Sequence, residues 1–333
     1  MRKQNVSNTM NKNTNLKRLD IIKEILPCMS ILLTLLLQVS IPDSGKHPQA
    51  DVPYFTYALV LALVMWAVTF GISFVNKNVQ KKLVFKGYFI AGAIFFLNVI
   101  NLLTVKFTLL PVLYFPSLDR IFGVLVTDRQ LIIKCLLYSA RLLLVGFFSG
   151  AIVGILCGIA IGFSKTVSYW LMPIVRVLGP IPSTAWIPLV LVCFPSAVSA
   201  STFLIAVAVW FPTTIMTSSG ISNVQNSYFE VSSTLGANRF AQIFRVGVPA
   251  VMPHMFLGLF NGTSASFITL ITAEMIGAKY GIGWYVNWQK ELLAYANVYA
   301  GLIVIAVVFS ILTTLLFKVR DKVLLWQKGV IKW

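Results

Sequence analysis

The sequence predicts an all-α fold, a polytopic membrane helix bundle with about eight spans. Of the 333 residues, 58% are hydrophobic and only 11% are charged, whereas a soluble domain carries about 25% charged residues. The mean hydropathy is +0.84, and apolar runs long enough to cross a bilayer recur along the chain. These observations exclude an ordinary soluble enzyme. The formal charge of +17 is therefore expected to reflect membrane orientation rather than nucleic-acid binding.

Eight apolar stretches are expected to span the membrane, and the fifth is short and carries Pro188 and Pro195. Their approximate limits are 25–42, 54–76, 87–105, 135–162, 184–196, 200–221, 250–276 and 297–317. An interfacial helix is expected over 168–183, ending at Gly179-Pro180, because proline cannot continue a helix. The first stretch is interpreted as a retained helix rather than a signal sequence, since no small-x-small cleavage pattern follows it.

The distribution of basic residues predicts that both termini are cytoplasmic. With this orientation, 19 of the 27 Lys and Arg residues fall in cytoplasmic segments, which are 1–24, 77–86, 163–183, 222–249 and 318–333. The external segments hold seven: Lys46, Lys106, Arg120, Arg129, Lys134, Lys279 and Lys290. An excess of Lys and Arg on the cytoplasmic side is the usual determinant of topology.

Motifs of catalysis and metal binding are absent from the sequence. It contains no GxxxxGK[ST], HExxH, GxSxG or CxxC, and Gly281-Ile282-Gly283 is too short for a dinucleotide fingerprint. The histidines His47 and His254 lie far apart in the sequence, and the four cysteines are irregularly spaced, which is typical of apolar packing residues. No catalytic residue, metal site or bound cofactor is therefore predicted for this chain.

Five glycines recur at every fourth residue of the fourth span: Gly146, Gly150, Gly154, Gly158 and Gly162. At about 100° per residue, they form a shallow stripe along one side of the helix. Small residues let two membrane helices approach closely, where the lipid provides no hydrophobic drive for association. The stripe predicts close helix packing, and by itself it indicates no function.

The segment 226–250 is amphipathic and too polar to span a membrane. Ser227 and Glu230 have the spacing of a capping box, and Gly236 after Leu235 has the position of a helix C-terminal glycine. Asn238 is expected to cap a second helix over 239–246. That helix has one apolar face of Phe240, Ile243 and Phe244, and Pro249 is expected to separate it from the next span. Two interpretations remain open, a hairpin on the membrane surface or a rigid knob in a partner's groove.

This segment resembles the EAA loop of ABC-transporter permeases. The sequence has Glu230-Val231-Ser232, three residues, Gly236, nine residues and Val246-Gly247-Val248-Pro249, with Val-Ser in place of the family's Ala-Ala. Flanking segments resemble permeases of the nitrate, sulfonate and taurine type over about residues 107–328. They are the run Pro180 to Pro188, the Ser139-Ala140-Arg141 opening of the glycine helix, and Ala273 to Ala278 followed by Gly281-Ile282-Gly283.

The resemblance implies a type I ABC importer permease core in the plasma membrane and an import function for a small anionic solute such as nitrate, a sulfonate or taurine. The implied partners are ATPase subunits that hold ATP and Mg, a second permease subunit in a homodimer, an extracytoplasmic substrate-binding protein and the lipid membrane, with no nucleic acid. The residues implied to contact or shape the ATPase-coupling loop are Ser227, Glu230, Leu235, Gly236, Ala237, Asn238, Arg239, Phe240 and Pro249.

Polar residues within the spans are candidates for the translocation path or its gate. They are Trp186, Ser264, Ser266, Thr269, Thr272 and Glu274. Glu274 is the one acidic residue placed within a predicted span, and such residues are costly in lipid. Pairing with Arg141 or gating at the external mouth is favoured over substrate contact, because a carboxylate is an odd ligand for an anion. The hydroxyls have a simpler alternative, which is bonding to their own helix.

Matching the permease core to residues 84–333, with its coupling loop at 222–249, leaves residues 1–83 as an extension with a basic leader and two extra spans. An ion-coupled secondary transporter is the alternative function. It would require ion-coupling residues and often an internal repeat, and neither is apparent in the sequence.

Overall fold

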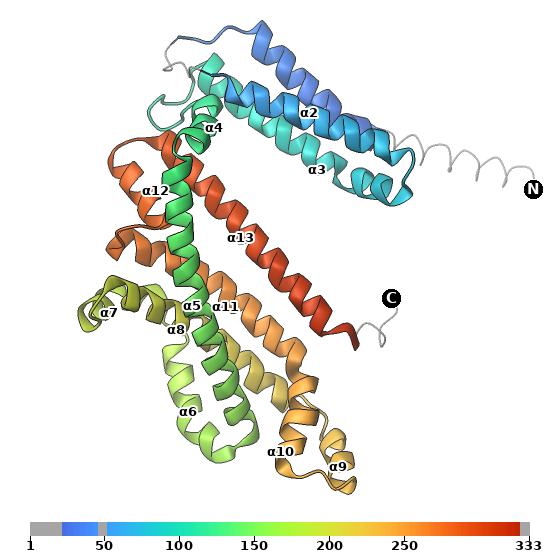
Figure 1. The fold of residues 1–333 in the computed structure, drawn as a ribbon, viewed down its shortest axis with the longest axis vertical. Coiled ribbons are helices and arrows are strands. Elements are labelled where there is room, and N and C mark those ends of the chain that lie inside the picture. The colour runs from blue at the N-terminus through green and yellow to red at the C-terminus, as the bar shows by residue number, and fades with distance from the viewer. Residues whose placement is uncertain (1–21, 46–51, 327–333) are drawn as a thin grey trace, which may run out of the picture. The chain divides into compact units, whose positions relative to one another are not determined.

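The computed structural model describes residues 22–45 and 52–326, which are helical with connecting turns and contain no strand (Figure 1). Within these described residues, seven helices are long and apolar enough to span a membrane. They are Ile22–Ser40, α2 (Tyr54–Ser73), α3 with its π-helical end (Lys77–Lys106), α5 (Arg129–Phe163), α8 (Ala197–Ser222), the helix Arg239–Gly277 that contains α11 (Val248–Gly277), and α13 (Tyr295–Val323). The all-α membrane fold predicted from the sequence is confirmed.

The predicted fifth span, 184–196, is not a spanning helix by itself. A 3₁₀ turn over Ser183–Trp186 leads into α7 (Ile187–Cys193), which is too short to cross a bilayer. With α6 (Lys165–Leu178) these residues form a pair bent by 85°, so the described residues contain up to eight spans if the bent pair counts as one. The bend follows from Gly179, Pro180 and Pro182, where the prolines supply no amide hydrogen to continue a helix.

The described residues form two compact units. One comprises Met1–Asp128 with Leu293–Ala300, and the other comprises Arg129–Leu292 with Gly301–Trp333. The first unit extends past the predicted extension of residues 1–83, because α3 and α4 (Leu118–Thr127) pack within it. Its buried apolar core consists of Ile31, Phe55, Leu59, Leu118, Ile121, Ala296 and Ala300.

Two polar side chains, the buried Lys106 and the half-buried Asp119, join the helix ends of the first unit. The Lys106 ammonium donates to the carbonyl of Gln38 at 2.9 Å and to that of Ile41, and it pairs with Asp43 at 2.7 Å. It therefore neutralises the end of the helix Ile22–Ser40. Asp119 accepts from the Phe55 amide at 2.9 Å, in the first turn of α2. Burial raises the pKa of the Asp119 carboxyl, which the Phe55 hydrogen bond opposes. Lys106, counted above as an external charge, is a structural residue.

In the second unit, α8 lies between α5 and α11, and glycines allow both contacts. The five glycines of α5 face α8: a Cβ atom at Gly150 would lie 2.9 Å from Cα of Ala206, and one at Gly158 would lie 2.5 Å from Cβ of Thr217. On the other side of α8, a Cβ atom at Gly258 of α11 would lie 2.9 Å from Cα of Thr213. The helix backbones are therefore in near contact along this seam, as small residues in membrane helices permit.

Gly150→Ala tests the α5–α8 seam. The added methyl group has no space, so we expect overpacking to destabilise the protein by about 1–3 kcal/mol. The control is Gly92→Ala in α3, because no atom lies within 4 Å of a Cβ atom there and removal of a mid-helix glycine stabilises a helix by roughly 0.5–1 kcal/mol. The measurement is the fraction of monodisperse protein that survives heating in detergent. Equal survival of the two variants would contradict the close approach.

Candidate functional site

The loop between α8 and α11 contains two short helices, α9 (Asn226–Thr234) and α10 (Arg239–Ala241), at one end of the second unit (Figure 1). Between them, Gly236 has a φ of +79°. The Gly236 amide donates to the Ser233 carbonyl at 3.0 Å, and the Ala237 amide donates to the Ser232 carbonyl at 3.0 Å. This pair of bonds is the Schellman motif, whose left-handed residue is usually glycine. The predicted helix end at Gly236 is confirmed.

Two side chains hold the angle between α9 and α10. Asn238 accepts from the Ala241 amide at 2.8 Å, so the predicted N-cap is present. Gln242 reaches back across the turn, where its amide donates to Ser233 Oγ at 2.7 Å and to the Ala237 carbonyl at 3.3 Å. No sequence pattern indicated Gln242, because its partners become neighbours only after the chain turns at Gly236.

The predicted capping box at Ser227 and Glu230 does not form. The helix α9 starts at Asn226 with Gln225 as its N-cap, and no side chain caps it. The Tyr228 amide donates to the Gln225 carbonyl at 3.1 Å, so the helix begins before Ser227 and the Ser227 hydroxyl is not at the capping position. Glu230 is exposed and has no hydrogen-bond or ion-pair partner among the described residues. Its carboxylate is therefore directed to solvent rather than to the loop itself.

Pro249 does not separate the loop from the next span, contrary to the sequence prediction. The helix runs without a break from Arg239 to Gly277 through a π-helical segment, Gln242–Gly247. Pro249 lies in the first turn of α11, directly after this segment, so the wider π-helical turn accommodates a residue that supplies no amide hydrogen. The second part of the loop, from Arg239, and the span consequently form one continuous helix of 39 residues, Arg239–Gly277.

The base of the loop is packed and its outer surface is apolar. The rings of Phe163, at the end of α5, and Phe229 meet edge to face at 5.9 Å, and a Cβ atom at Gly247 would clash with the Phe163 ring. On the outside, Leu235 is 82% exposed and Phe240 is 69% exposed. A fixed turn with exposed apolar side chains fits insertion into a protein groove.

Glu274, near the end of α11, is fully buried and both of its oxygens are satisfied. Ser139 of α5 donates its hydroxyl hydrogen to Oε1 at 2.6 Å, and the Gly283 amide donates to Oε2 at 2.9 Å. The Ile282 amide in turn donates to Ser139 Oγ at 2.9 Å. The carboxylate thus binds the first turn of α12 (Ile282–Glu291), where negative charge is favoured by the helix dipole.

The predicted pairing of Glu274 with Arg141 is wrong. Ser139 and Arg141 lie on opposite sides of α5, because two residues correspond to about 200° of rotation. Ser139 faces Glu274 and Arg141 is exposed. The two glycines of Gly281-Ile282-Gly283 make room for the carboxylate: Gly281 has a φ of +141°, and a Cβ atom on it would lie 2.6 Å from Glu274 Oε1.

Most of the predicted pathway hydroxyls bond to their own helix, as in the simpler alternative. Ser264 donates to the Phe260 carbonyl at 3.4 Å, Ser266 to that of Thr263 at 2.8 Å and Thr272 to that of Ile268 at 2.9 Å. Thr269 also bonds to the Ala265 carbonyl at 2.9 Å, but it shares a further hydrogen bond of 2.6 Å with the hydroxyl of Ser183. Trp186 packs against the apolar cluster around Ile187 and Leu204.

A cavity of about 290 Å³ lies where the bent segment after α6 meets α8 and α11. Its polar lining residues are Ser183, Thr184, Trp210, Asn261 and Thr269. Thr269 is the one predicted pathway residue in this lining. The proline-rich break at 180–182 could have indicated that Ser183 and Thr184 line a cavity. For Asn261, the available indication was a single amide side chain within an otherwise apolar span.

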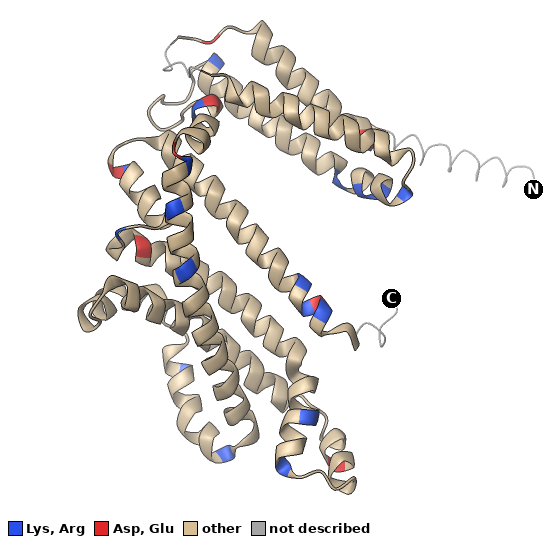
Figure 2. Cartoon of the chain, viewed as in Figure 1, with Lys and Arg blue, Asp and Glu red and all other residues tan. Residues whose placement is uncertain are grey.

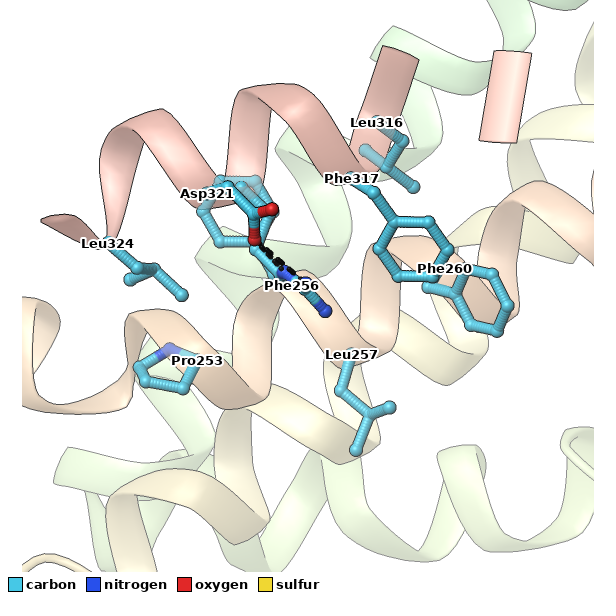
Figure 3. A pocket seen from close by; sticks show the side chains of 9 residues that line it. Pro253, Phe256, Leu257, Phe260, Leu316, Phe317, Asp321 and Leu324 are labelled. Carbon is cyan, nitrogen blue, oxygen red and sulfur yellow. Dashed lines mark hydrogen bonds and ion pairs between the residues drawn. The ribbon is translucent and has the colours of Figure 1, made fainter. Parts of the chain in front are cut away.

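A larger cavity of about 440 Å³ lies between α11 and α13, and its walls are mainly apolar (Figure 3). The one cation among its described lining residues, Arg320, lies 2.8 Å from Asp321 Oδ1 and 4.7 Å from the centre of the Phe317 ring. The guanidinium charge is thus neutralised within its own helix. Among the described residues, no group of three or more His, Cys, Asp or Glu side chains is arranged to hold a metal ion.

Ser139→Ala tests the attachment of α12. The variant leaves a carboxylate oxygen and the Ile282 amide buried without partners, at a cost of about 1–3 kcal/mol for each group. We expect faster hydrogen exchange across residues 279–291. Ser149→Ala on the same helix is the control, since its hydroxyl bonds only to the Gly146 carbonyl. Unchanged exchange in Ser139→Ala would exclude this role for Glu274.

Comparisons with known proteins identify the family. The family model described as "Binding-protein-dependent transport system inner membrane component" matches residues 150–323, just over half of the chain. The taurine transport system permease protein TauC of Escherichia coli is 31% identical over 192 residues, which are 58% of this chain and 70% of that protein. The putative aliphatic sulfonates transport permease protein SsuC of Bacillus subtilis is 31% identical over 193 residues, 58% of this chain and 69% of that protein.

Further matches agree with this assignment. The nitrate import permease protein NrtB of Synechocystis is 34% identical over 183 residues, 55% of this chain and 64% of that protein. An inward-facing structure of the MetNI methionine ABC transporter shares the fold, with a TM-score of 0.50, 15% identity, and coverage of 59% of this chain and 97% of that one. The chain therefore has the type I ABC importer permease fold and belongs to the family of binding-protein-dependent transport system inner membrane components, as a multi-pass membrane permease of the nitrate, sulfonate and taurine type.

Proposed function

We propose that this chain is the membrane-spanning subunit of an ATP-driven importer for a small anionic or zwitterionic solute, such as taurine, a sulfonate or nitrate. The observation that carries the proposal is the loop at α9 and α10. It combines a turn fixed by Gly236, Asn238 and Gln242 with an exposed apolar surface at Leu235 and Phe240. A partner subunit can displace such a loop without bending it.

The continuous helix Arg239–Gly277 supports a direct mode of coupling. It begins at the loop, passes the cavity at Thr269 and ends beside the Glu274 contact with α12. A helix without a break transmits an axial displacement over its full length, whereas a hinge at Pro249 would absorb it. We propose that ATPase closure moves the loop, and that this helix carries the movement to the cavity and to α12 at the far end, where α12 gates the path.

The cavity at the bent segment supports passage of an oxyanion. Ser183, Thr184, Asn261 and Trp210 provide hydroxyl, amide and indole hydrogen-bond donors, and no carboxylate lines it among the described residues. Glu274 is buried against α12 and does not line this cavity. We therefore assign Glu274 to the position of α12 rather than to solute contact.

The partners proposed for this chain are two ATPase subunits, a second permease subunit that makes a homodimer and an extracytoplasmic substrate-binding protein. ATP and Mg belong to the ATPase subunits, and no cofactor is assigned to this chain. The excess of Lys and Arg supports cytoplasmic termini and a cytoplasmic loop at 222–249. Nucleic acid is not a partner in this proposal, and hydrolysis is not a reaction of this chain.

Gly236→Val tests the coupling loop. The backbone of Gly236 has a left-handed conformation, so a β-branched side chain there strains the turn by about 1–3 kcal/mol and is expected to displace Leu235 and Phe240. We expect solute uptake to fall at least about tenfold while the assembled complex still hydrolyses ATP, since each 1.4 kcal/mol of lost coupling is worth a factor of about ten. Glu230→Lys, which reverses an exposed charge on the same loop, is expected to act in the same direction.

The control for this experiment is Gly71→Val in α2. Gly71 has an ordinary helical conformation, and no atom lies within 4 Å of a Cβ atom on it. Uptake of radiolabelled taurine, ethanesulfonate or nitrate and ATP hydrolysis are compared at matched membrane levels. Wild-type uptake by Gly236→Val would disprove the role of the loop.

The cavity is tested with Asn261→Leu and Thr184→Val, which remove hydrogen-bond donors and acceptors from its wall. We expect the apparent KM for uptake to rise by about three- to tenfold, because the solute loses hydrogen bonds worth about 0.5–1.5 kcal/mol each. Ser264→Ala is the control, since Ser264 bonds to its own helix. An equal change in all three variants would show that this cavity is not the path.

A further inference from the structure

The first unit contains a cavity of about 380 Å³ that the transport function does not use. Three helices line it: Ile22–Ser40 through Ile31, α2 through Ala62, Met65, Trp66 and Thr69, and α3 through Val79, Lys82, Leu83, Lys86, Ile90 and Ile94. Except at Thr69 and the two lysines, these side chains are apolar or aromatic. The size of the cavity is within the range of ligand pockets, about 300–1,000 Å³.

The charged wall of this cavity carries one sign. Lys82 and Lys86 are exposed and lie one helical turn apart on the same side of α3. No acidic residue lines the cavity, and neither lysine has an ion-pair partner among the described residues. An anion at this position would therefore offset two positive charges.

The apolar part of the cavity extends along the membrane span. The candidate span Lys77–Lys106 carries its lysines at one end, while Ile90 and Ile94 lie one and two turns further along the same face. Figure 2 shows the lysines gathered at the start of α3. This order, charge at the end of the span and hydrocarbon beyond it, matches a headgroup phosphate followed by an acyl chain.

We propose that the cavity binds an anionic phospholipid, with its phosphate on Lys82 and Lys86 and an acyl chain along Ile90 and Ile94. The cavity of Figure 3 does not have this property, because its Arg320 is paired with Asp321. The first unit, which includes the extension of residues 1–83, thereby acquires a function of its own, as a lipid-binding unit.

A second pair of lysines on α3 provides an internal control. Lys77 and Lys81 have the same spacing and are also exposed, but they do not line the cavity. At about 100° per residue, they lie about 100–140° away from Lys82 around the helix. If the lysines acted only as topology signals, replacing either pair would have the same effect on lipid binding. If the cavity binds a lipid, only replacement of Lys82 and Lys86 weakens that binding.

The test measures phosphatidylglycerol bound to the purified full chain by native mass spectrometry, with phosphatidylcholine as the neutral probe. We expect Lys82→Gln/Lys86→Gln to weaken phosphatidylglycerol binding by about tenfold or more, as expected for the loss of two lysine contacts with an anionic lipid. Lys77→Gln/Lys81→Gln is expected to bind like the wild type. Equal weakening by both double variants, or equal binding of the two lipids by the wild type, would overturn the proposal.

A further variant tests the acyl-chain part of the cavity. Ala62→Phe fills the cavity without changing its charge, and we expect it to weaken phosphatidylglycerol binding as well. Millimolar glycerol 1-phosphate, which has the headgroup chemistry without the chains, is expected not to displace the lipid. Displacement by glycerol 1-phosphate, or wild-type lipid binding by Ala62→Phe, would show that the site takes a free phosphate group and would overturn the lipid assignment.

Discussion

The near contact between the backbones of α5 and α8 determines the arrangement of the second unit. Five glycines at every fourth position of α5 place no α5 side chain between the helices, and Thr214 of α8 donates to the Gly154 carbonyl at 3.2 Å within this contact. Because α11 packs on the other side of α8 through Gly258 and Gly262, the position of α11 depends on the first contact. The cavity at Ser183 and the end of α11 at Glu274 are placed by these two interfaces.

The helix that contains α11 joins the two ends of this unit. At one end, Asn238 and Gln242 hold the turn that carries the exposed apolar side chains. At the other end, Glu274 binds Ser139 of α5 and the first turn of α12. The π-helical segment at Gln242–Gly247 is the irregular part of this helix, and irregular helical turns of this kind are frequent at functional sites. In the proposed mechanism, a displacement of the loop relative to α5 changes the geometry at Thr269 and at α12.

Features set by local chain geometry were predictable from the sequence. Helical periodicity predicted the glycine stripe. The preference for glycine at the left-handed residue after a helix predicted the role of Gly236, and the capping preference of asparagine predicted that of Asn238. Features that depend on packing were not predictable. The start of α9 depends on how the chain leaves α8, so the expected capping box at Ser227 was wrong.

Other differences have the same origin. The helix continues through Pro249 because a π-helical segment precedes this residue. The sequence pattern does not specify such a segment. The 85° bend after α6 brings Ser183 to Thr269, two residues far apart in the sequence. The partner of Glu274 is Ser139 rather than Arg141, because the two residues lie on opposite sides of α5 and Ser139 is the one that faces Glu274. Each of these contacts is decided by neighbours from another helix.

The energy source of transport tests the central claim most directly. The permease is reconstituted in liposomes with its ATPase and substrate-binding protein, and solute uptake is measured with ATP supplied or withheld and with ionophores present or absent. ATP-driven import by displacement of the α9–α10 loop predicts uptake that requires ATP and is unaffected by ionophores. Uptake that continues without ATP and collapses with the ion gradient would contradict this account and would favour an ion-coupled secondary transporter.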